Sequence, residues 1–180
     1  MGGVLGCFEL FDGSEETTLV LLPPEQVFLF FLPAMAANLL LYLTGYFFGP
    51  SSVVPIDQRI IWRGRRLVGE GRGLTSLPRA LAAGMLCGAL QGRLEEAVVL
   101  ALGAQLGMVL NSMVKRRRGL PRGESHLPWD HLDFVLGAAL VYGLHYDLDT
   151  AMWVSGLVYC GACHMVVSHV LRAVLEPVKS

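Results

Sequence analysis

The residues best suited to chemistry lie in one stretch between two long apolar runs, Lys115 to Phe134, which reads KRRRGLPRGESHLPWDHLDF. Four cations open the stretch, and Asp130 and Asp133 stand three residues apart where the second apolar run begins. If that run starts as a helix, both carboxylates point from the same face. Because cations bind phosphate oxygens and carboxylates bind Mg²⁺, the stretch suits a polyphosphate with its divalent metal.

The same residues also have a purely structural interpretation. Basic loops beside membrane helices commonly serve only to set topology. An Asp pair at the start of a helix often caps that helix and interacts favourably with its dipole. From this stretch alone both interpretations stay open.

The composition predicts a membrane protein. The chain has 180 residues, of which 53% are hydrophobic, and its mean hydropathy is +0.52. A chain this apolar cannot enclose its own hydrophobic surface as a soluble domain, so we expect one membrane-embedded unit over residues 1–180 that contacts membrane lipids. The first residues, MGGVLGCFELF, lack a basic n-region, so we expect no cleaved signal peptide. We expect no nucleic-acid partner.

The apolar runs predict an all-α fold, a bundle of five transmembrane helices with two loops that form the active site. The predicted spans are 27–48, 77–91, 97–114, 132–146 and 151–171, and the loops are 49–76 and 115–131. The first loop is expected to hold a short interfacial helix around Ile60, Ile61 and Trp62. Small residues repeat every four positions in the second and third spans, which predicts close helix packing there.

The charge distribution predicts the orientation in the cell membrane. In the five-span arrangement, thirteen of the fourteen Lys and Arg residues fall on one side, and Arg93 alone falls on the other. The positive-inside rule then places both loops and the C-terminus in the cytoplasm and the N-terminus outside. Nucleoside triphosphates are on the cytoplasmic side.

Other motifs give weaker indications. The letters CGACH, from Cys160 to His164, match the haem attachment pattern, but they fall within a predicted membrane helix, so we expect no haem. A zinc site made by Cys160, Cys163, His164 and His169 stays open, although no second ligand pair closes it. No GxSxG, HExxH or Walker A sequence occurs, which leaves hydrolase and P-loop functions without support.

Three groups of motifs together resemble one family. PAMAAN begins at Pro33, PID begins at Pro55 and GRRLVGEGR begins at Gly64. SMVKRRRG begins at Ser112, and DHLDFVLGA begins at Asp130. In this order the motifs are similar to those of the archaeal CDP-archaeol synthases, and they cover the chain from Pro33 to Ala138.

The resemblance implies a CTP-dependent cytidylyltransferase with Mg²⁺ as its metal. Its lipid substrate would be a glycerol phosphate that carries two geranylgeranyl ether chains, and its products CDP-archaeol and pyrophosphate. The catalytic candidates are Lys115, Asp130 and Asp133, and the two aspartates are also the metal candidates. The CTP-binding candidates come from the first span and both loops: Asn38, Asp57, Arg66, Gly69, Glu70, Gly71, Arg72, Lys115, Arg116 and Arg117.

One departure from the family pattern concerns the metal. The family often has Gly-Asp where this chain has Gly107 and Met108, so a carboxylate is missing near the expected site. The departure makes Asp130 and Asp133 the stronger metal candidates here.

A function of another class also fits the composition. A small transporter would line its pathway with polar groups inside the spans, such as Asn38, Gln105 and Asn111. The basic loops would then be topology anchors only.

Overall fold

A computed structural model describes residues 20–48, 54–58, 60–68, 73–121, 124 and 126–175. Within these residues the chain forms five α-helices and one two-stranded hairpin. The elements are α1 (Pro24–Phe48), β1 (Ile61–Trp62), β2 (Arg65–Arg66), α2 (Ser76–Gln91), α3 (Leu94–Arg118), α4 (Trp129–Gly143) and α5 (Thr150–Leu175). Four of the predicted CTP-binding residues, Gly69, Glu70, Gly71 and Arg72, lie outside the described residues.

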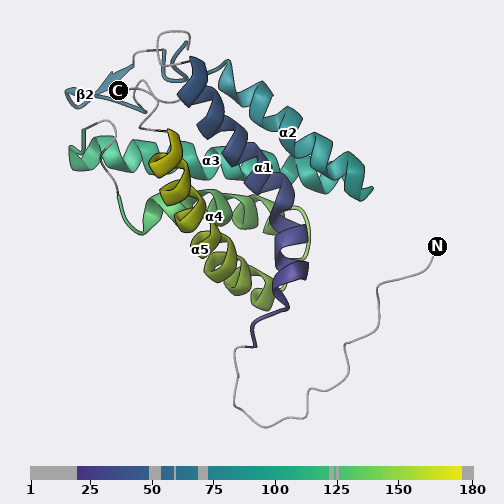
Figure 1. Ribbon diagram of the computed structural model, residues 1–180. Coiled ribbons are helices and arrows are strands. Elements are labelled where there is room, and N and C mark those ends of the chain that lie inside the picture. The colour runs from purple at the N-terminus through teal and green to yellow at the C-terminus, as the bar shows by residue number, and fades with distance from the viewer. Residues whose placement is uncertain are drawn as a thin grey trace.

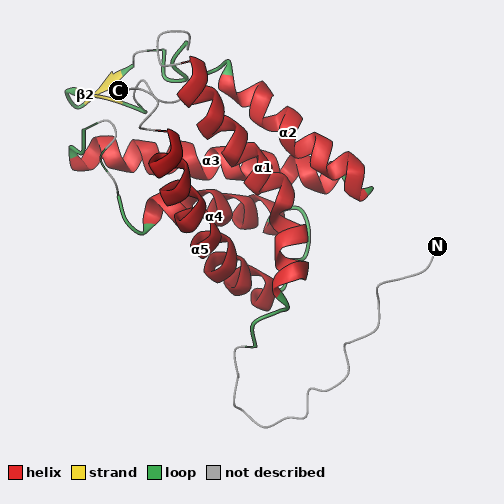
Figure 2. Cartoon of the chain, viewed as in Figure 1, coloured by secondary structure: helices red, strands yellow, loops and turns green. Residues whose placement is uncertain are grey.

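The helices pack as a bundle, which confirms the predicted all-α fold (Figures 1 and 2). α1 lies beside α2, and α3 crosses both helices and packs along α4 (Figure 1). Phe31, Leu100 and Phe134 are fully or almost fully buried and join α1, α3 and α4 in one core. The centre of the bundle is therefore made by the first, third and fourth helices.

Three helices, α1, α3 and α5, are long and apolar enough to cross a membrane. α2 and α4 have 16 and 15 residues, or about 24 and 22 Å of helix, which is less than a ~30 Å hydrocarbon core. Large apolar side chains such as Leu86, Leu106 and Val170 are exposed on the outside of the bundle, as lipid contact requires. Five complete crossings remain a prediction.

Pro33 shapes the contact between α1 and the turn that joins α2 to α3. Proline has no backbone N–H, so the carbonyl of Leu29, four residues earlier, lacks its helical donor. The side chains of Gln91 and Arg93 donate hydrogen bonds to this carbonyl at 2.8 and 2.6 Å, and Arg93 also reaches the carbonyl of Phe30. These bonds fix the α2–α3 turn against the first half of α1.

Glycines allow α3 and α4 to approach at backbone distance. A Cβ atom added at Gly103 would lie 2.5 Å from the carbonyl oxygen of Gly137, and one added at Gly107 would overlap the carbonyl of Asp133. The small residues of α2 act similarly, because a Cβ at Gly84 would lie 2.6 Å from that of Ala101. The close packing predicted from the spacing of small residues is confirmed.

The predicted interfacial helix around Ile60, Ile61 and Trp62 is wrong, because Ile61 and Trp62 form a β-strand. They pair antiparallel with Arg66 and Arg65, respectively. The turn between the strands, Arg63 and Gly64, has φ angles of 50° and 74°. Two residues with positive φ are what a tight hairpin turn requires, and they break a helix.

The third helix is longer than the predicted span. It continues through all four cations of the basic cluster and ends at Gly119, which has a left-handed φ of 80°. Cations in the last turn interact favourably with the helix dipole. Lys115 is therefore carried on a helix and not on a loop.

Candidate active site

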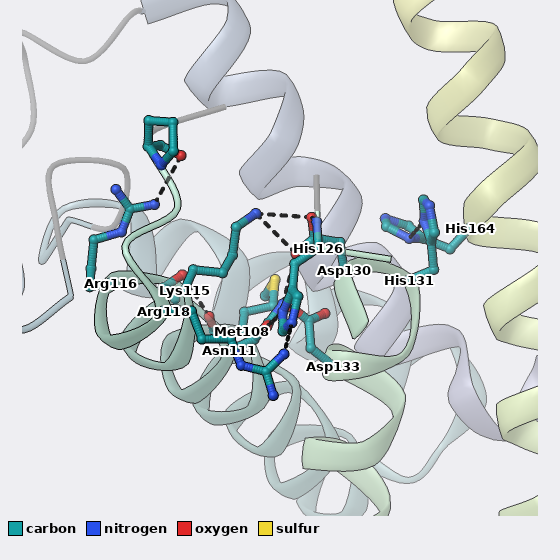
Figure 3. A network of polar contacts seen from close by, with 12 residues as sticks. Met108, Asn111, Lys115, Arg116, Arg118, His126, Asp130, His131, Asp133 and His164 are labelled. Carbon is teal, nitrogen blue, oxygen red and sulfur yellow. Dashed lines mark hydrogen bonds and ion pairs between the residues drawn. The ribbon is translucent and has the colours of Figure 1, made fainter. Parts of the chain in front are cut away.

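Asn111 of α3 is the centre of a polar network between α3 and α4 (Figure 3). Its side-chain nitrogen donates to Asp130 Oδ1 at 2.8 Å and to Asp133 Oδ2 at 2.9 Å. The two carboxylates point from one face of α4, because three residues are nearly one helical turn. Gly107, one turn before Asn111, allows the close approach that these bonds need.

Lys115 lies one turn beyond Asn111 and binds Asp130. Its ammonium nitrogen is 2.9 and 3.1 Å from the two oxygens of that carboxylate. Partial burial raises the pKa of Asp130, but the hydrogen bonds from the amide of His126, from Lys115 and from Asn111 lower it more, so the pKa lies below its usual value. Asp130 is therefore a carboxylate at neutral pH.

His126 and Arg118 extend the network, and the sequence analysis missed both of them as site residues. The amide of His126 donates to Asp130 at 2.8 Å, and its Nδ1 lies 3.1 Å from the side-chain oxygen of Asn111. Arg118 Nη1 lies 2.6 Å from His126 Nε2. One signal was available, because His126 precedes Asp130 by four residues, where the chain must return to the first turn of α4.

A cavity of about 450 Å³ opens next to this network, between α3, α4 and α5. Its polar lining consists of Asn111, Arg118, His126 and Asp133. The rest of the lining is mainly apolar and includes Leu110, Val114, Trp129, Leu136, Leu140 and Trp153. The site thus joins charged groups to an apolar space.

Comparison with known proteins identifies the family. The family described as CarS-like, CDP-archaeol synthase, matches residues 94–174. CDP-archaeol synthase of Sulfolobus acidocaldarius is 33% identical over 152 residues, which are 79% of this chain and 88% of that protein. The Methanopyrus kandleri protein of the same name is 38% identical over 136 residues, with 69% of this chain and 73% of that protein covered. The chain belongs to the CDP-archaeol synthase family.

A solved structure shares this fold. It is described as an intramembrane enzyme for archaeal membrane lipid biosynthesis. The comparison covers 81% of this chain and 94% of the solved chain, with a TM-score of 0.68 and 30% sequence identity. The resemblance inferred from the motifs is confirmed, and the protein is a multi-pass membrane protein.

In this protein the hairpin docks on the cationic end of α3. Arg117 donates to the carbonyl oxygens of Trp62 at 2.6 Å and of Arg66 at 3.0 Å, and its guanidinium lies 4.8 Å from the centre of the Trp62 ring. Arg65 donates in return to the carbonyls of Arg116 and Arg117. Several CTP-binding candidates thus hold the first loop against α3.

Asp57 and Arg66 lie together inside the first loop. Arg66 Nη2 is 2.7 Å from Asp57 Oδ1, and the amide of Val68 donates to Asp57 Oδ2 at 3.0 Å. Only 3% of Asp57 is exposed. These contacts give Asp57 a part in organising the loop. The hydrogen bonds of Asn111 within the described residues go to other partners, Asp130, Asp133 and His126.

Asn38 lies elsewhere in the bundle. It lines a second cavity, of about 230 Å³, between α1 and α5, together with His164 and Ser168. His164 Nδ1 is 3.0 Å from His131 Nδ1, and His131 adjoins Asp130 in α4. Asn38 therefore lines a different cavity from the one that Asn111 lines.

The oxygen donors of the network fit Mg²⁺. Asp130 and Asp133 share the amide of Asn111, so two carboxylates meet at one point. Mg²⁺ in nucleotide sites is commonly held by one or two carboxylates, with phosphate oxygens and water completing its shell. Among the described residues no group of three His, Cys, Asp or Glu side chains could hold a metal, so the zinc site considered at Cys160 is not formed.

Met108 occupies the position at which the family often has aspartate. Only 2% of its side chain is exposed, and it belongs to the same core cluster as Phe134. It lies close to the network (Figure 3). A thioether supplies no charge, so Asp130 and Asp133 are the carboxylates that this part of the structure offers to a metal.

Proposed function

We propose that this protein transfers the cytidylyl group of CTP to the phosphate of an unsaturated isoprenoid diether lipid, which forms CDP-archaeol and pyrophosphate. One observation carries the proposal: Asn111 bonds two carboxylates, one of which pairs with Lys115, beside an apolar cavity. A nucleotide needs the charged groups, and a lipid needs the apolar space. The relatives described above bear the name CDP-archaeol synthase.

The proposed reaction needs no general base. A phosphate monoester has a second pKa near ~6, so the lipid phosphate is mostly a dianion at neutral pH. One of its oxygens attacks the α-phosphorus of CTP. The new P–O bond forms as the bond to the bridging oxygen breaks, and pyrophosphate leaves with that electron pair. The protein must therefore neutralise charge and align the reactants.

Lys115 is proposed to contact the triphosphate, with Arg116 and Arg117 adding positive charge at the same helix end. Asp130 and Asp133 are proposed to hold Mg²⁺, which would neutralise phosphate charge when it is bound. Arg66, Asp57 and Asn38 stay candidates for nucleotide contacts, together with four candidates outside the described residues, Gly69, Glu70, Gly71 and Arg72. Lys115 pairs with Asp130 through two contacts, and its ammonium group has three N–H donors.

The proposed orientation places the hairpin and the cationic end of α3 in the cytoplasm. These two basic elements contact each other, which supports their being on one side. Arg93, the basic residue predicted for the opposite side of the membrane, donates to the carbonyl of Leu29, near the N-terminal end of α1. With this orientation the site meets the cytoplasmic pool of CTP.

The transporter interpretation finds no support in the positions of the polar residues. Asn111 is engaged by two carboxylates, whereas Asn38 lines a different cavity. Gln105 is buried in α3 and lines neither cavity. The three side chains do not form one pathway.

The test is cytidylyl transfer by purified protein in detergent with labelled CTP and Mg²⁺. Three acceptors are compared: the glycerol phosphate with two geranylgeranyl ether chains, a diacylglycerol phosphate and the matching diether alcohol without phosphate. We expect label in the lipid fraction with the isoprenoid phosphate and none with the alcohol. Absence of transfer to either lipid phosphate, by protein that binds CTP, would contradict the proposed function.

A further inference from the structure

Arg118 places a cation at the polar end of the apolar cavity. It leaves the last turn of α3 and lines the cavity, whereas Lys115, three residues earlier, reaches Asp130 and is not part of the lining. Arg118 was not among the site residues predicted from the sequence. In the structure it takes part in the site through a defined contact with His126.

The contact between Arg118 and His126 has a fixed direction. A guanidinium can only donate hydrogen bonds, so Nε2 of His126 must accept. The imidazole proton is then on Nδ1 and is donated to the side-chain oxygen of Asn111. Asn111 in turn uses its nitrogen to donate to both carboxylates. This chain of bonds holds the guanidinium at a set position relative to the carboxylate pair.

The guanidinium keeps donors for a ligand. The bond to His126 is the one hydrogen bond that the described residues give to Arg118, and a guanidinium has five N–H groups. Arginine presents these donors in a planar fork that matches the oxygens of a phosphate. An anion in the cavity could therefore bind Arg118 without breaking the network.

The remainder of the cavity suits the chains of a lipid. Leu110, Val114, Leu140 and Trp153 line it and are also exposed, so the cavity is open on the flank of the bundle. A molecule with an anionic head and an apolar body could enter from the membrane without crossing water. Its head would then meet Arg118 beside Asp133 and Asn111.

We propose that Arg118 binds the phosphate of the lipid acceptor, with the lipid chains in the cavity, while the nucleotide is held from the Lys115 side. This inference rests on the proposed function. It separates the two substrates: the acceptor oxygen reaches the α-phosphorus from the cavity, and pyrophosphate leaves toward Lys115. In-line displacement requires this arrangement of attacking and leaving oxygens.

The test measures two quantities for each full-length variant, the KM for the lipid phosphate and the Kd for CTP. Loss of a charged contact should raise the lipid KM of Arg118→Ala roughly ten- to a hundredfold and leave the Kd for CTP unchanged. Arg118→Lys should recover part of the loss, because lysine keeps the charge without the fork. Arg172→Ala, which removes an exposed cation on α5 that does not line this cavity, is the matched control and should behave as wild type.

A second variant tests the cavity independently of the arginine. Val114→Trp places a bulky side chain in the lining and should raise the lipid KM without changing the Kd for CTP. Retained CTP binding shows that each variant is folded. A raised Kd for CTP with an unchanged lipid KM in Arg118→Ala would overturn the inference and leave the proposed function intact. Absence of transfer by the wild type would instead count against the function itself.

Discussion

At the residue scale, the site depends on Asn111 as much as on the charged groups. Its single amide meets Asp130, Asp133 and the ring of His126. A neutral amide that bonds two carboxylates keeps them together despite their like charge. The negative charge of the pair is then available to a metal.

Asp133→Asn is expected to abolish turnover and to leave the protein folded. The substitution keeps the shape of the side chain but removes a negative charge from the proposed Mg²⁺ site. Cytidylyl transfer at increasing Mg²⁺ concentration is the measurement, with Asp147→Asn, an exposed acid in the turn before α5, as the control. Near-normal Mg²⁺-dependent activity of Asp133→Asn would rule out the metal assignment.

Lys115→Ala is expected to weaken CTP binding, because it removes a charge-assisted contact with the triphosphate. Such a contact is worth about 1.5–3 kcal/mol, hence roughly ten- to a hundredfold in affinity. Arg118→Ala should have much less effect on the same affinity, since Arg118 faces the cavity. Isothermal titration of CTP against both variants checks this, and wild-type affinity in both would count against a nucleotide site at Lys115.

The sequence was sufficient to predict part of this site. Helical periodicity, which places residues three or four apart on one face, predicted that Asp130 lies beside Asp133 and that Lys115 lies beside Asn111. The contact between Arg118 and His126 could not be predicted in this way, because it depends on the path of the chain between α3 and α4. Asn111 was noted as polar, but its role required knowing that α3 and α4 are neighbours.

At the element scale, the packing of α3 on α4 determines whether the site exists. Gly103, Gly107 and Gly137 remove side chains where the two backbones meet. The spacing of small residues predicted such packing, although it did not identify the partner helix. The hairpin was missed because an apolar run at Ile60 is equally compatible with an interfacial helix, and only the turn at Arg63 and Gly64 distinguishes them.

Gly107→Ala is expected to destabilise the protein and reduce cytidylyl transfer. The added Cβ would overlap the backbone carbonyl of Asp133, which cannot move away as a flexible side chain could. Overpacking of this kind typically costs about 1–3 kcal/mol. Thermal unfolding in detergent is the measurement.

Gly45→Ala in α1 is the matched control. An added Cβ at Gly45 meets no atom within 4 Å, and alanine is the better helix former, so this variant should be at least as stable as wild type. Equal stability of the Gly107 and Gly45 variants would show that the close approach of α3 and α4 is not required.

At the scale of the whole molecule, basic residues gather where the hairpin meets the last turn of α3. The hairpin and the last turn of α3 form one basic region, and both contribute to the contacts around Trp62. Many exposed apolar side chains, such as Leu86, Leu106 and Val170, lie on the helices. This distribution is what a multi-pass membrane protein needs, and it follows from composition and charge alone.

Cysteine labelling in intact cells tests the proposed orientation. In a background without the native cysteines, Gly2→Cys should react with a membrane-impermeant reagent, and Ser180→Cys should react only after the membrane is opened. The thirteen-to-one division of Lys and Arg is the reason for this expectation. Labelling of both ends from the same side would exclude an odd number of crossings.

The most direct test of the central claim is the fate of the phosphates of CTP. Two parallel reactions with the isoprenoid diether phosphate use CTP labelled at the α-phosphate or at the γ-phosphate. Cytidylyl transfer predicts that the α label enters the lipid and the γ label leaves as pyrophosphate. Transfer of the γ label to the lipid would identify a kinase reaction and contradict the account, as would the absence of both labels from the lipid.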